Sequence, residues 1–256
     1  MFVAVIALLC CAGVAQAQVP VNPGIDLWET QAGTYANFAD NPLPAGFFPG
    51  CALPFAGQVP LVGDPIAADK AIGTSDTIVQ RTGTINFGTT GTGTTGLVMA
   101  ALCLKNTSWV DPCGGAWGVK VRLSTPQVVG SLTATLSSAS GGSFSTNLTA
   151  KGDVIFSNGG TNLTATDTIN LSGSGLWQYT PPPGAVVVSG PVMVDSNCDG
   201  TLDKVLPGTS NFFPGSVTHT GPHPVKPPKP CQDTVPTNAV GRVIKCAVVA
   251  DPAAVD

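Results

Sequence analysis

The amino-acid sequence predicts an all-β fold, an antiparallel β-sandwich with a proline-rich C-terminal tail. Short segments alternate apolar and polar residues at every second position, and no segment of helical length shows apolar residues at helical spacing. Composition supports this prediction, because only 10% of the 256 residues are charged and 31 are Gly. Glu29 is the single glutamate, and a chain rich in Val, Thr, Ser and Gly favours strands and turns.

The N-terminus has the features of a secretory signal peptide over residues 1–17. An apolar run over 2–12 is followed by Ala15-Gln16-Ala17, which match the apolar core and the A-x-A cleavage site of such a peptide. The run is too short to span a bilayer, and no later segment reaches the roughly 18 apolar residues that a spanning helix needs. The sequence therefore predicts a secreted protein, extracellular or periplasmic, with no membrane span.

Residues 18–212 are predicted to form the sandwich domain. Its first part, 18–64, is rich in Pro and Gly with short apolar pieces, and 88–96 is predicted to be a Gly/Thr loop. The continuous apolar sequence over 97–105 predicts a central strand buried on both faces, and strict alternation predicts half-buried strands at 119–123 and 132–136. The other predicted strands are 76–81, 84–87, 143–157, 162–171, 185–189 and 192–194. About eight to ten strands with turn residues between them are typical of a sandwich.

The character of the sequence changes after this domain. Seven Pro residues fall between 214 and 236, which predicts that 213–256 begins as an extended linker with polyproline II tendency. Residues 239–249 are apolar enough to add a small hairpin, so the tail is expected to end in a short disulfide-closed segment.

The stretch 195–203 reads D-x-N-x-D-G-x-x-D and is the most specific motif of the chain. Oxygen-bearing side chains of Asp195, Asn197, Asp199 and Asp203 occupy loop positions 1, 3, 5 and 9, and Gly200 stands where a calcium loop turns sharply. Calcium takes several oxygen ligands, so three carboxylates and one amide in one loop predict a calcium site. The simpler alternative is a polar turn of Asp, Asn and Gly, which needs no metal.

The same segment is similar to the calcium loops of dockerins and of thrombospondin type 3 repeats. The resemblance implies one set of ligands: the side chains of Asp195, Asn197, Asp199 and Asp203 and the backbone carbonyl of Thr201. It covers only the nine residues of the loop. Loop position 12, where an EF-hand has a bidentate Glu, is Leu206, which predicts weak affinity on the order of 10⁻⁴–10⁻³ M. Cohesin binding is not implied, because the flanking segments have the sequence of strands rather than helices.

Three further motifs resemble, in kind and in order, those of a group of uncharacterised bacterial secreted proteins. They are G-I-D-L-W at 24–28, P-A-G-F-F at 44–48 and P-G-T-S-N-F at 207–212, with the predicted calcium loop between the second and the third. The resemblance extends over most of the chain and implies export and a β-rich fold. It implies no activity and no catalytic residues.

The cysteines support export. Of the eight Cys, two lie in the predicted signal peptide, and an even number remains, as expected for disulfides in an exported chain. The remaining six are Cys51, Cys103, Cys113, Cys198, Cys231 and Cys246. Spacing favours Cys103–Cys113 and Cys231–Cys246 as local disulfides, which leaves Cys51–Cys198 by elimination. Zinc binding is not favoured, because the cysteines are scattered and form no C-x-x-C pair.

Few residues offer catalytic chemistry, and we expect no enzyme. The two histidines, His219 and His223, fall among prolines; they could bind a metal, but a polar linker is the favoured interpretation. The sequence contains no G-x-S-x-G nucleophile elbow. Asp153 and Asp167 lie in predicted strands and could face one cleft, as a hydrolase would require, although solvent exposure is the favoured interpretation.

Three functional hypotheses remain. The first is a non-enzymatic structural or adhesive module, stabilised by calcium and disulfides, which contacts a polysaccharide or another cell-surface component. The second is a carbohydrate-binding module that uses exposed side chains of Trp28, Trp109, Trp117 and Trp177, and the third is an extracellular hydrolase. Nucleic acid is not an expected partner, because the net charge of −4 provides no basic surface.

Overall fold

The computed structural model describes residues 18–30, 32–214, 244–245 and 248–249. These residues contain no helix, and every pairing between their strands is antiparallel. The predicted all-β antiparallel fold is therefore confirmed. The predicted C-terminal disulfide Cys231–Cys246 and the two histidines lie outside the described residues.

Among the described residues, twelve strands are connected in one large sheet, and two form a small separate one. The first strands of the large sheet are β1 (Gly24–Thr30), β2 (Tyr35–Asn37), β3 (Gln58–Gly63), β4 (Thr77–Arg81), β5 (Thr92–Asn106) and β6 (Gly118–Leu123). The later ones are β7 (Gly130–Ser138), β8 (Gly141–Asn158), β9 (Thr161–Gln178), β12 (Phe213–Pro214), β13 (Ile244–Lys245) and β14 (Val248–Val249). The small sheet pairs β10 (Val192–Val194) with β11 (Lys204–Leu206).

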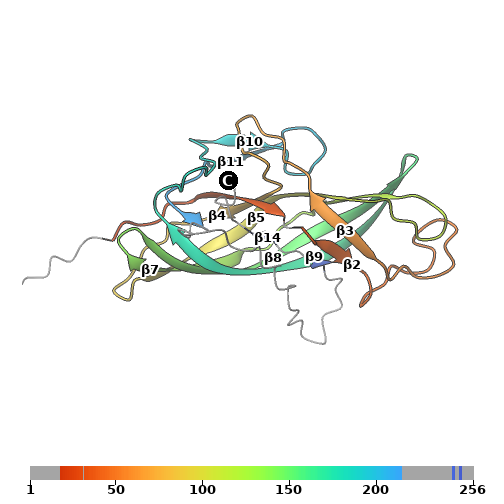
Figure 1. Ribbon diagram of the computed structural model, residues 1–256, viewed down its shortest axis with the longest axis horizontal. Helices are drawn as coiled ribbons and strands as arrows, with labels where there is room; N and C mark the ends of the chain where they lie inside the picture. Colours follow the sequence, from red (N-terminus) through yellow and green to blue (C-terminus); the bar gives the residue numbers. More distant parts are fainter. Residues whose placement is uncertain (1–17, 31, 215–243, 246–247, 250–256) are drawn as a thin grey trace, which may run out of the picture.

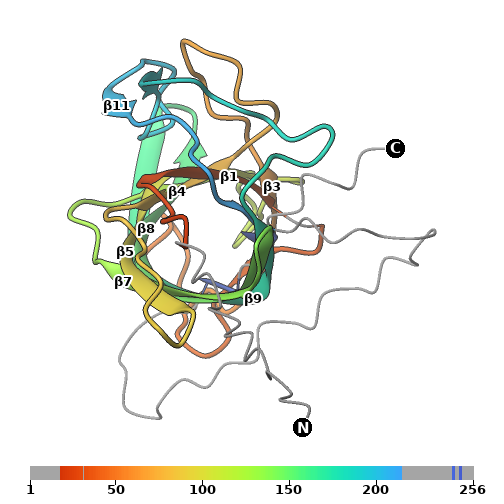
Figure 2. The same ribbon diagram turned by 90° about the vertical axis from the view of Figure 1, so that its left-hand side faces the viewer.

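The large sheet curls so that its arms face each other across a core (Figure 2). β5 is central: it pairs with β3 and β4 along one edge and with β6 and β7 along the other. β8 joins β6 and β7 to β9, and the hairpin of β8 and β9 turns at Gly159 and Gly160, both with positive φ. A two-residue turn of this kind needs positive φ at both positions, which glycine adopts freely. The two layers of the predicted sandwich thus belong to one continuous sheet.

Residues 208–214 join the two edges of the curled sheet, and we call this segment the seam. The Ile25 N–H of β1 donates to the Gly208 carbonyl at 3.1 Å, and β12, at the end of the seam, pairs with β9. The seam approaches β1 closely, because a Cβ on Gly24 would lie 2.9 Å from the Cβ of Ser210. Bringing the first and last described parts of the domain together in this way closes the sheet.

Alternation along the strands separates two apolar cores. The inner core fills the curled sheet and includes a ring cluster in which Phe48 contacts Phe156 and Trp117 edge-on. The outer core lies between the outside of the sheet and a cap, which we define as residues 64–76 and 185–209. Figure 1 shows β10 and β11 of this cap above β4 and β5. The outer core consists of Ile25, Ile66, Ile72, Ile78, Ala100, Ala101, Cys103, Val188, Val192, Val194 and Leu206.

β5 is buried on both faces, as predicted for 97–105. Leu102 and Leu104 point into the inner core, whereas Ala101 and Cys103 point into the outer core. The pairing with β4 shifts register between Ile78 and Val79, and this bulge places two consecutive β5 residues, at 100 and 101, in the outer core. The continuous apolar run exists because each face of this strand covers a different core.

Three of the predicted boundaries are wrong. Residues 92–96, predicted to be a loop, form the first part of β5 and pair with β7. Small residues are required there, since a Cβ on Gly93 would lie 2.5 Å from the Asn86 carbonyl oxygen. Residues 185–189 are predicted to be a strand but form irregular chain in the cap. Residues 84–87 are also predicted to be a strand, but they contain only a single bridge, between Ile85 and Val21.

The predicted disulfides Cys103–Cys113 and Cys51–Cys198 are also wrong. The structure contains Cys51–Cys113 and Cys103–Cys198. Cys103 points into the outer core and so meets the cap, whereas Cys113 lies in the loop after β5. The prediction failed because it relied on proximity in the sequence. Cys103 lies on the cap face of β5, whereas the loop that follows β5 does not reach that face.

Candidate functional sites in the cap and at the seam

The predicted calcium loop lies at the end of the cap hairpin, between β10 and β11. The strand residues that flank the loop pair, Val194 with Lys204, and the Asp203 N–H donates to the Val194 carbonyl at 2.9 Å. Cys198 and Gly200 both have positive φ, 60° and 92°. Positive φ is rare for a residue with a side chain, and Cys198 is held there by its bond to Cys103 on β5.

Side-chain oxygens of the loop accept backbone N–H groups of the same loop. The Asp195 carboxylate accepts from Asp199 at 3.2 Å and from Gly200 at 2.7 Å. The Asn197 Oδ1 accepts from Asp199 at 3.0 Å, and the Asp199 Oδ1 accepts from Thr201 at 2.8 Å. These hydrogen bonds fold the chain around Asp195. A polar turn can form such bonds without any metal.

Asp203, the last predicted ligand, closes the base of the loop. Its carboxylate accepts the Ser196 N–H at 2.7 Å and the Ser196 hydroxyl at 3.1 Å. The neighbouring Lys204 turns to the sheet, where its ammonium donates to the Ala100 carbonyl at 3.2 Å. Burial lowers the pKa of Lys204, and the charge of Asp203 opposes that shift.

The charges of the loop are unevenly compensated. The Thr201 N–H is the main cause that holds the pKa of Asp199 below its usual value, and Arg122 on β6 contributes to the same effect. Asp195 is only 4% exposed. Within the described residues, no Lys, Arg or His makes an ion pair with it. A buried carboxylate of this kind is costly unless a cation or several N–H donors compensate it.

The donor set of the loop fits a calcium ion in part. A carboxylate has about four acceptor sites, so the N–H groups that Asp195 accepts leave lone pairs for a cation. In the part of the chain that the structure describes, no three His, Cys, Asp or Glu side chains lie close enough together to form a metal-binding group. Calcium coordination by Asp195, Asn197, Asp199, Thr201 and Asp203 stays a prediction.

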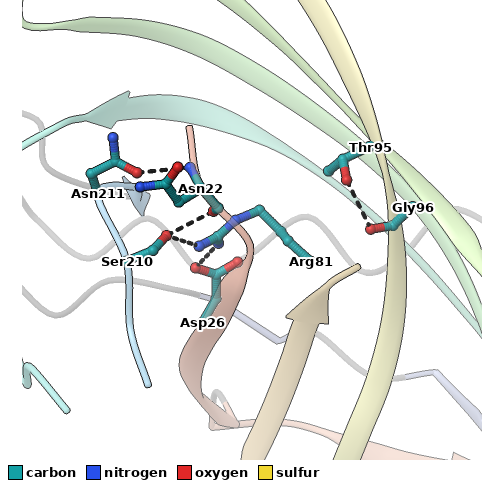
Figure 3. Close-up of polar contacts among 7 residues, drawn as sticks. All are labelled: Asn22, Asp26, Arg81, Thr95, Gly96, Ser210 and Asn211. Carbon is teal, nitrogen blue, oxygen red and sulfur yellow. Dashed lines mark hydrogen bonds and ion pairs between the residues drawn. The ribbon is translucent and has the colours of Figure 1, made fainter. Parts of the chain in front are cut away.

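A buried ion pair at the seam was not predicted from the sequence. Arg81 of β4 contacts Asp26 of β1 through Nη1, and the side chains are 0% and 2% exposed. Its Nη2 donates to the Ser210 hydroxyl at 2.7 Å, and its guanidinium lies 4.7 Å from the centre of the Phe212 ring. Figure 3 shows Arg81 reaching Asp26 and Ser210 together. One side chain therefore joins two strands and the seam.

Further polar bonds extend this network to the N-terminal segment. The Ser210 hydroxyl donates to the Asn22 carbonyl at 2.9 Å, and the Asn211 amide donates to the Pro20 carbonyl at 2.9 Å. The Arg81 Nε, in contrast, is buried without a hydrogen-bond partner among the described atoms. Burial raises the pKa of Asp26 while the Arg81 charge opposes the shift. The sequence contains only a weak signal for this ion pair. Predicting it requires knowing that Arg81 and Asp26 occupy inward positions of paired strands.

Asp76, immediately before β4, is a third buried carboxylate. It accepts the Thr30 N–H at 2.8 Å and the hydroxyls of Thr30 and Thr77 at 2.7 Å each. Gly63 makes room for it, because a Cβ there would lie 1.8 Å from the Asp76 Oδ2. Burial raises the pKa of Asp76, and these hydrogen bonds oppose the rise. The carboxylate ties the end of β1 to β4.

The four tryptophans do not form an exposed pair. Trp28, Trp117 and Trp177 belong to the inner core at 2–8% exposure, whereas Trp109 is 70% exposed. Although Trp109 and Trp117 are close in sequence, the bridge between Val110 and Trp117 turns the second ring inward. Asp153, a hydrolase candidate, accepts the hydroxyl of Thr166 on the neighbouring strand β9.

Comparisons with protein-family models, with curated proteins and with solved structures found no match. Among the described residues, no helix is long and apolar enough to cross a membrane. The class that the fold defines is an all-β, disulfide-bonded module, and the sites within it are the cap loop and the seam network.

Proposed function

We propose that this chain is a secreted, non-enzymatic module in which disulfides and a calcium ion at 195–203 stabilise a rigid β-sandwich with a structural or adhesive role. Polysaccharide or another cell-surface component is the proposed partner. Two disulfides support secretion, because such bonds persist mainly in oxidising compartments.

The observation that carries the calcium proposal is the burial of the Asp195 carboxylate without a cationic side chain paired to it among the described residues. Its carboxylate is 4% exposed, it accepts two loop N–H groups, and it makes no ion pair within the described part of the chain. A bound cation would neutralise that charge and draw the oxygens of Asn197 and Asp199 to the same point. The ion would then hold the end of the cap hairpin in one shape.

Melting curves with calcium and with a chelator test this proposal. Calcium at a hundredfold excess over Kd should stabilise the wild-type protein by about 2.7 kcal/mol. Asp195→Ala and Asp199→Ala should each abolish that gain, because each removes a charged ligand. Magnesium should give a smaller gain, since it demands octahedral geometry and loses its water reluctantly.

Asp111→Ala is the matched control. Asp111 also accepts a loop N–H, from Gly114, but it lies outside the cap, so this variant should keep the full calcium gain. Equal melting temperatures for the wild-type protein with calcium and with chelator would show that 195–203 is only a turn.

Trp109 favours a second candidate function, which is carbohydrate binding through one exposed tryptophan ring rather than four. Its ring is 70% exposed and lies against Gly118, where a Cβ would be 3.1 Å from the ring. A held, exposed ring can stack on a sugar. Pull-down with insoluble cellulose or chitin should then capture the wild-type protein and lose Trp109→Ala. Equal capture of both proteins, or of neither, contradicts this candidate.

A further inference from the structure

The cap hairpin has an apolar inner face that depends on the sheet beneath it. Val192, Val194 and Leu206 are 0–2% exposed and point into the outer core, whereas Met193 and Val205 on the other face are 39% and 61% exposed. A two-stranded hairpin is marginally stable alone. The hairpin therefore needs its contact with β4 and β5 to keep its shape.

Three hydrogen bonds join the hairpin to the other half of the cap. The Asp195 N–H donates to the Ala67 carbonyl at 2.9 Å, and the Asp69 N–H donates to the Met193 carbonyl at 3.0 Å. The Met193 N–H donates in return to the Asp69 side chain at 2.8 Å. The two halves of the cap are thus hydrogen-bonded to each other.

Two direct ties hold the hairpin at 192–206 to the central strand. One is the covalent bond between Cys103 of β5 and Cys198 of the loop. The other is the hydrogen bond from the Lys204 ammonium to the Ala100 carbonyl, at the bulge where β5 and β4 change register. A single hydrogen bond can break and re-form as the hairpin moves, whereas the covalent bond cannot, so the disulfide is the dominant tie. The other half of the cap is bonded to β5 separately, because the Asp64 N–H donates to the Cys103 carbonyl and the Cys103 N–H donates to the Asp76 carbonyl, each at 2.8 Å.

We propose that Cys103–Cys198 is a redox latch, whose reduction lets the cap hairpin, residues 192–206, leave the outer face of β4 and β5 while the large sheet stays folded. This goes beyond the proposed function and does not depend on calcium. The sheet keeps its own strand pairing, its inner core and the separate Cys51–Cys113 bond. Local units of this kind open at lower free energy than the core that carries them.

The reductant is a dithiol. Its thiolate attacks Sγ of Cys198, which is half-buried, whereas Cys103 is 3% exposed. The Sγ–Sγ bond breaks, a mixed disulfide forms on Cys198, and Cys103 takes up a proton. The second thiol of the reductant then displaces Cys198 and closes a disulfide within the reductant. Two electrons and two protons have moved from the dithiol to the two cysteines.

Hydrogen–deuterium exchange on the full chain tests the latch. In the Cys103→Ser/Cys198→Ser variant, amides of 192–206 should exchange roughly tenfold faster or more, whereas amides of β8 and β9 should keep the wild-type rate. Cys51→Ser/Cys113→Ser is the matched control, since it also removes one disulfide. That control should leave exchange in the cap unchanged.

A second measurement covers the case in which the serine variant does not fold. Wild-type protein is titrated with dithiothreitol, alkylated and mapped, while tryptophan fluorescence is followed. All four tryptophans lie outside the cap, so Cys103 and Cys198 should become alkylated before the fluorescence changes. Alkylation only with loss of the tryptophan signal, or unchanged cap exchange in a folded variant, would overturn the latch.

Discussion

Arg81 joins three segments that are far apart in the sequence, its own strand β4 included. It meets Asp26 on β1, the hydroxyl of Ser210 and the ring of Phe212 on the seam, while belonging to β4 itself. A buried ion pair is weak evidence for stability, because desolvation offsets much of the attraction. Removing one partner is nevertheless costly, since the other charge then stays buried without compensation.

Arg81→Met should therefore destabilise the protein by about 3–5 kcal/mol, because it leaves the Asp26 carboxylate buried and unpaired. Denaturant unfolding at neutral pH measures the effect. The double variant Arg81→Met/Asp26→Leu should recover most of the loss, since it removes both charges and keeps apolar volume.

Lys105→Met is the matched control for Arg81→Met. The Lys105–Asp64 pair is exposed, with side chains 48% and 29% accessible, and should contribute less than about 1 kcal/mol. Equal losses in Lys105→Met and Arg81→Met would mean that burial of the seam pair has no energetic consequence.

Asp76 should give the stability a specific pH dependence. Burial raises its pKa above the usual value of 3.8, and Glu29 adds to the rise, so the folded protein binds the proton more tightly than the unfolded chain. This contribution to stability is complete below the unfolded pKa and is lost as the pH rises through the folded pKa, by about 1.4 kcal/mol for each unit of the shift.

Asp76→Asn should remove this dependence. We expect the stability of wild type relative to the variant to increase as the pH falls from 7 through the folded pKa, and chemical unfolding at a series of pH values measures it. A difference that stays constant, or that increases with pH, would show that burial does not control this carboxylate.

Among the strands, β8 depends most on close backbone approach. Gly142 lies between the pairing partners Leu136 on β7 and Trp177 on β9. A Cβ there would be 1.9 Å from the Thr135 carbonyl oxygen and 2.8 Å from the Ser137 nitrogen. Backbone atoms on a paired strand cannot move away without breaking the ladder, so this position requires glycine.

Gly142→Ala should destabilise the fold by roughly 1–3 kcal/mol or more, as expected for overpacking. Gly88→Ala is the matched control, since a Cβ at Gly88 meets no atom within 4 Å and should change stability by less than about 0.5 kcal/mol. Thermal unfolding of both variants compares them directly. A similar melting temperature for the two would mean that β7 and β8 separate there at little cost.

The curled sheet and its cap together explain why one chain of this length carries two cores. The large sheet buries its inner face by curling and closes along the seam at 208–214. The outer faces of β1, β4 and β5 would then remain apolar and exposed, and the cap covers them. Each disulfide fixes a part that the strand ladders do not hold: Cys103–Cys198 the cap, and Cys51–Cys113 two loops beyond the strand ends.

The sequence alone was sufficient for features that depend on local pattern. Alternation identified the all-β class, and the apolar run of 97–105 identified the strand buried on both faces. The turn between the predicted strands 143–157 and 162–171 and the Asp195 loop were visible in the same way, because turn geometry is set by a few adjacent residues. Its calcium ligands remain a prediction of that local pattern.

Features that depend on contacts between distant residues required the three-dimensional structure. Cys103 pairs with Cys198 rather than with Cys113 because its side chain points to the cap face of β5, and spacing along the chain contains no information about that face. Arg81 and Asp26 are ordinary charged residues until the seam brings Ser210 and Phe212 to them. Strand order and curvature decide these contacts, and both arise from packing of the complete sheet rather than from any one segment.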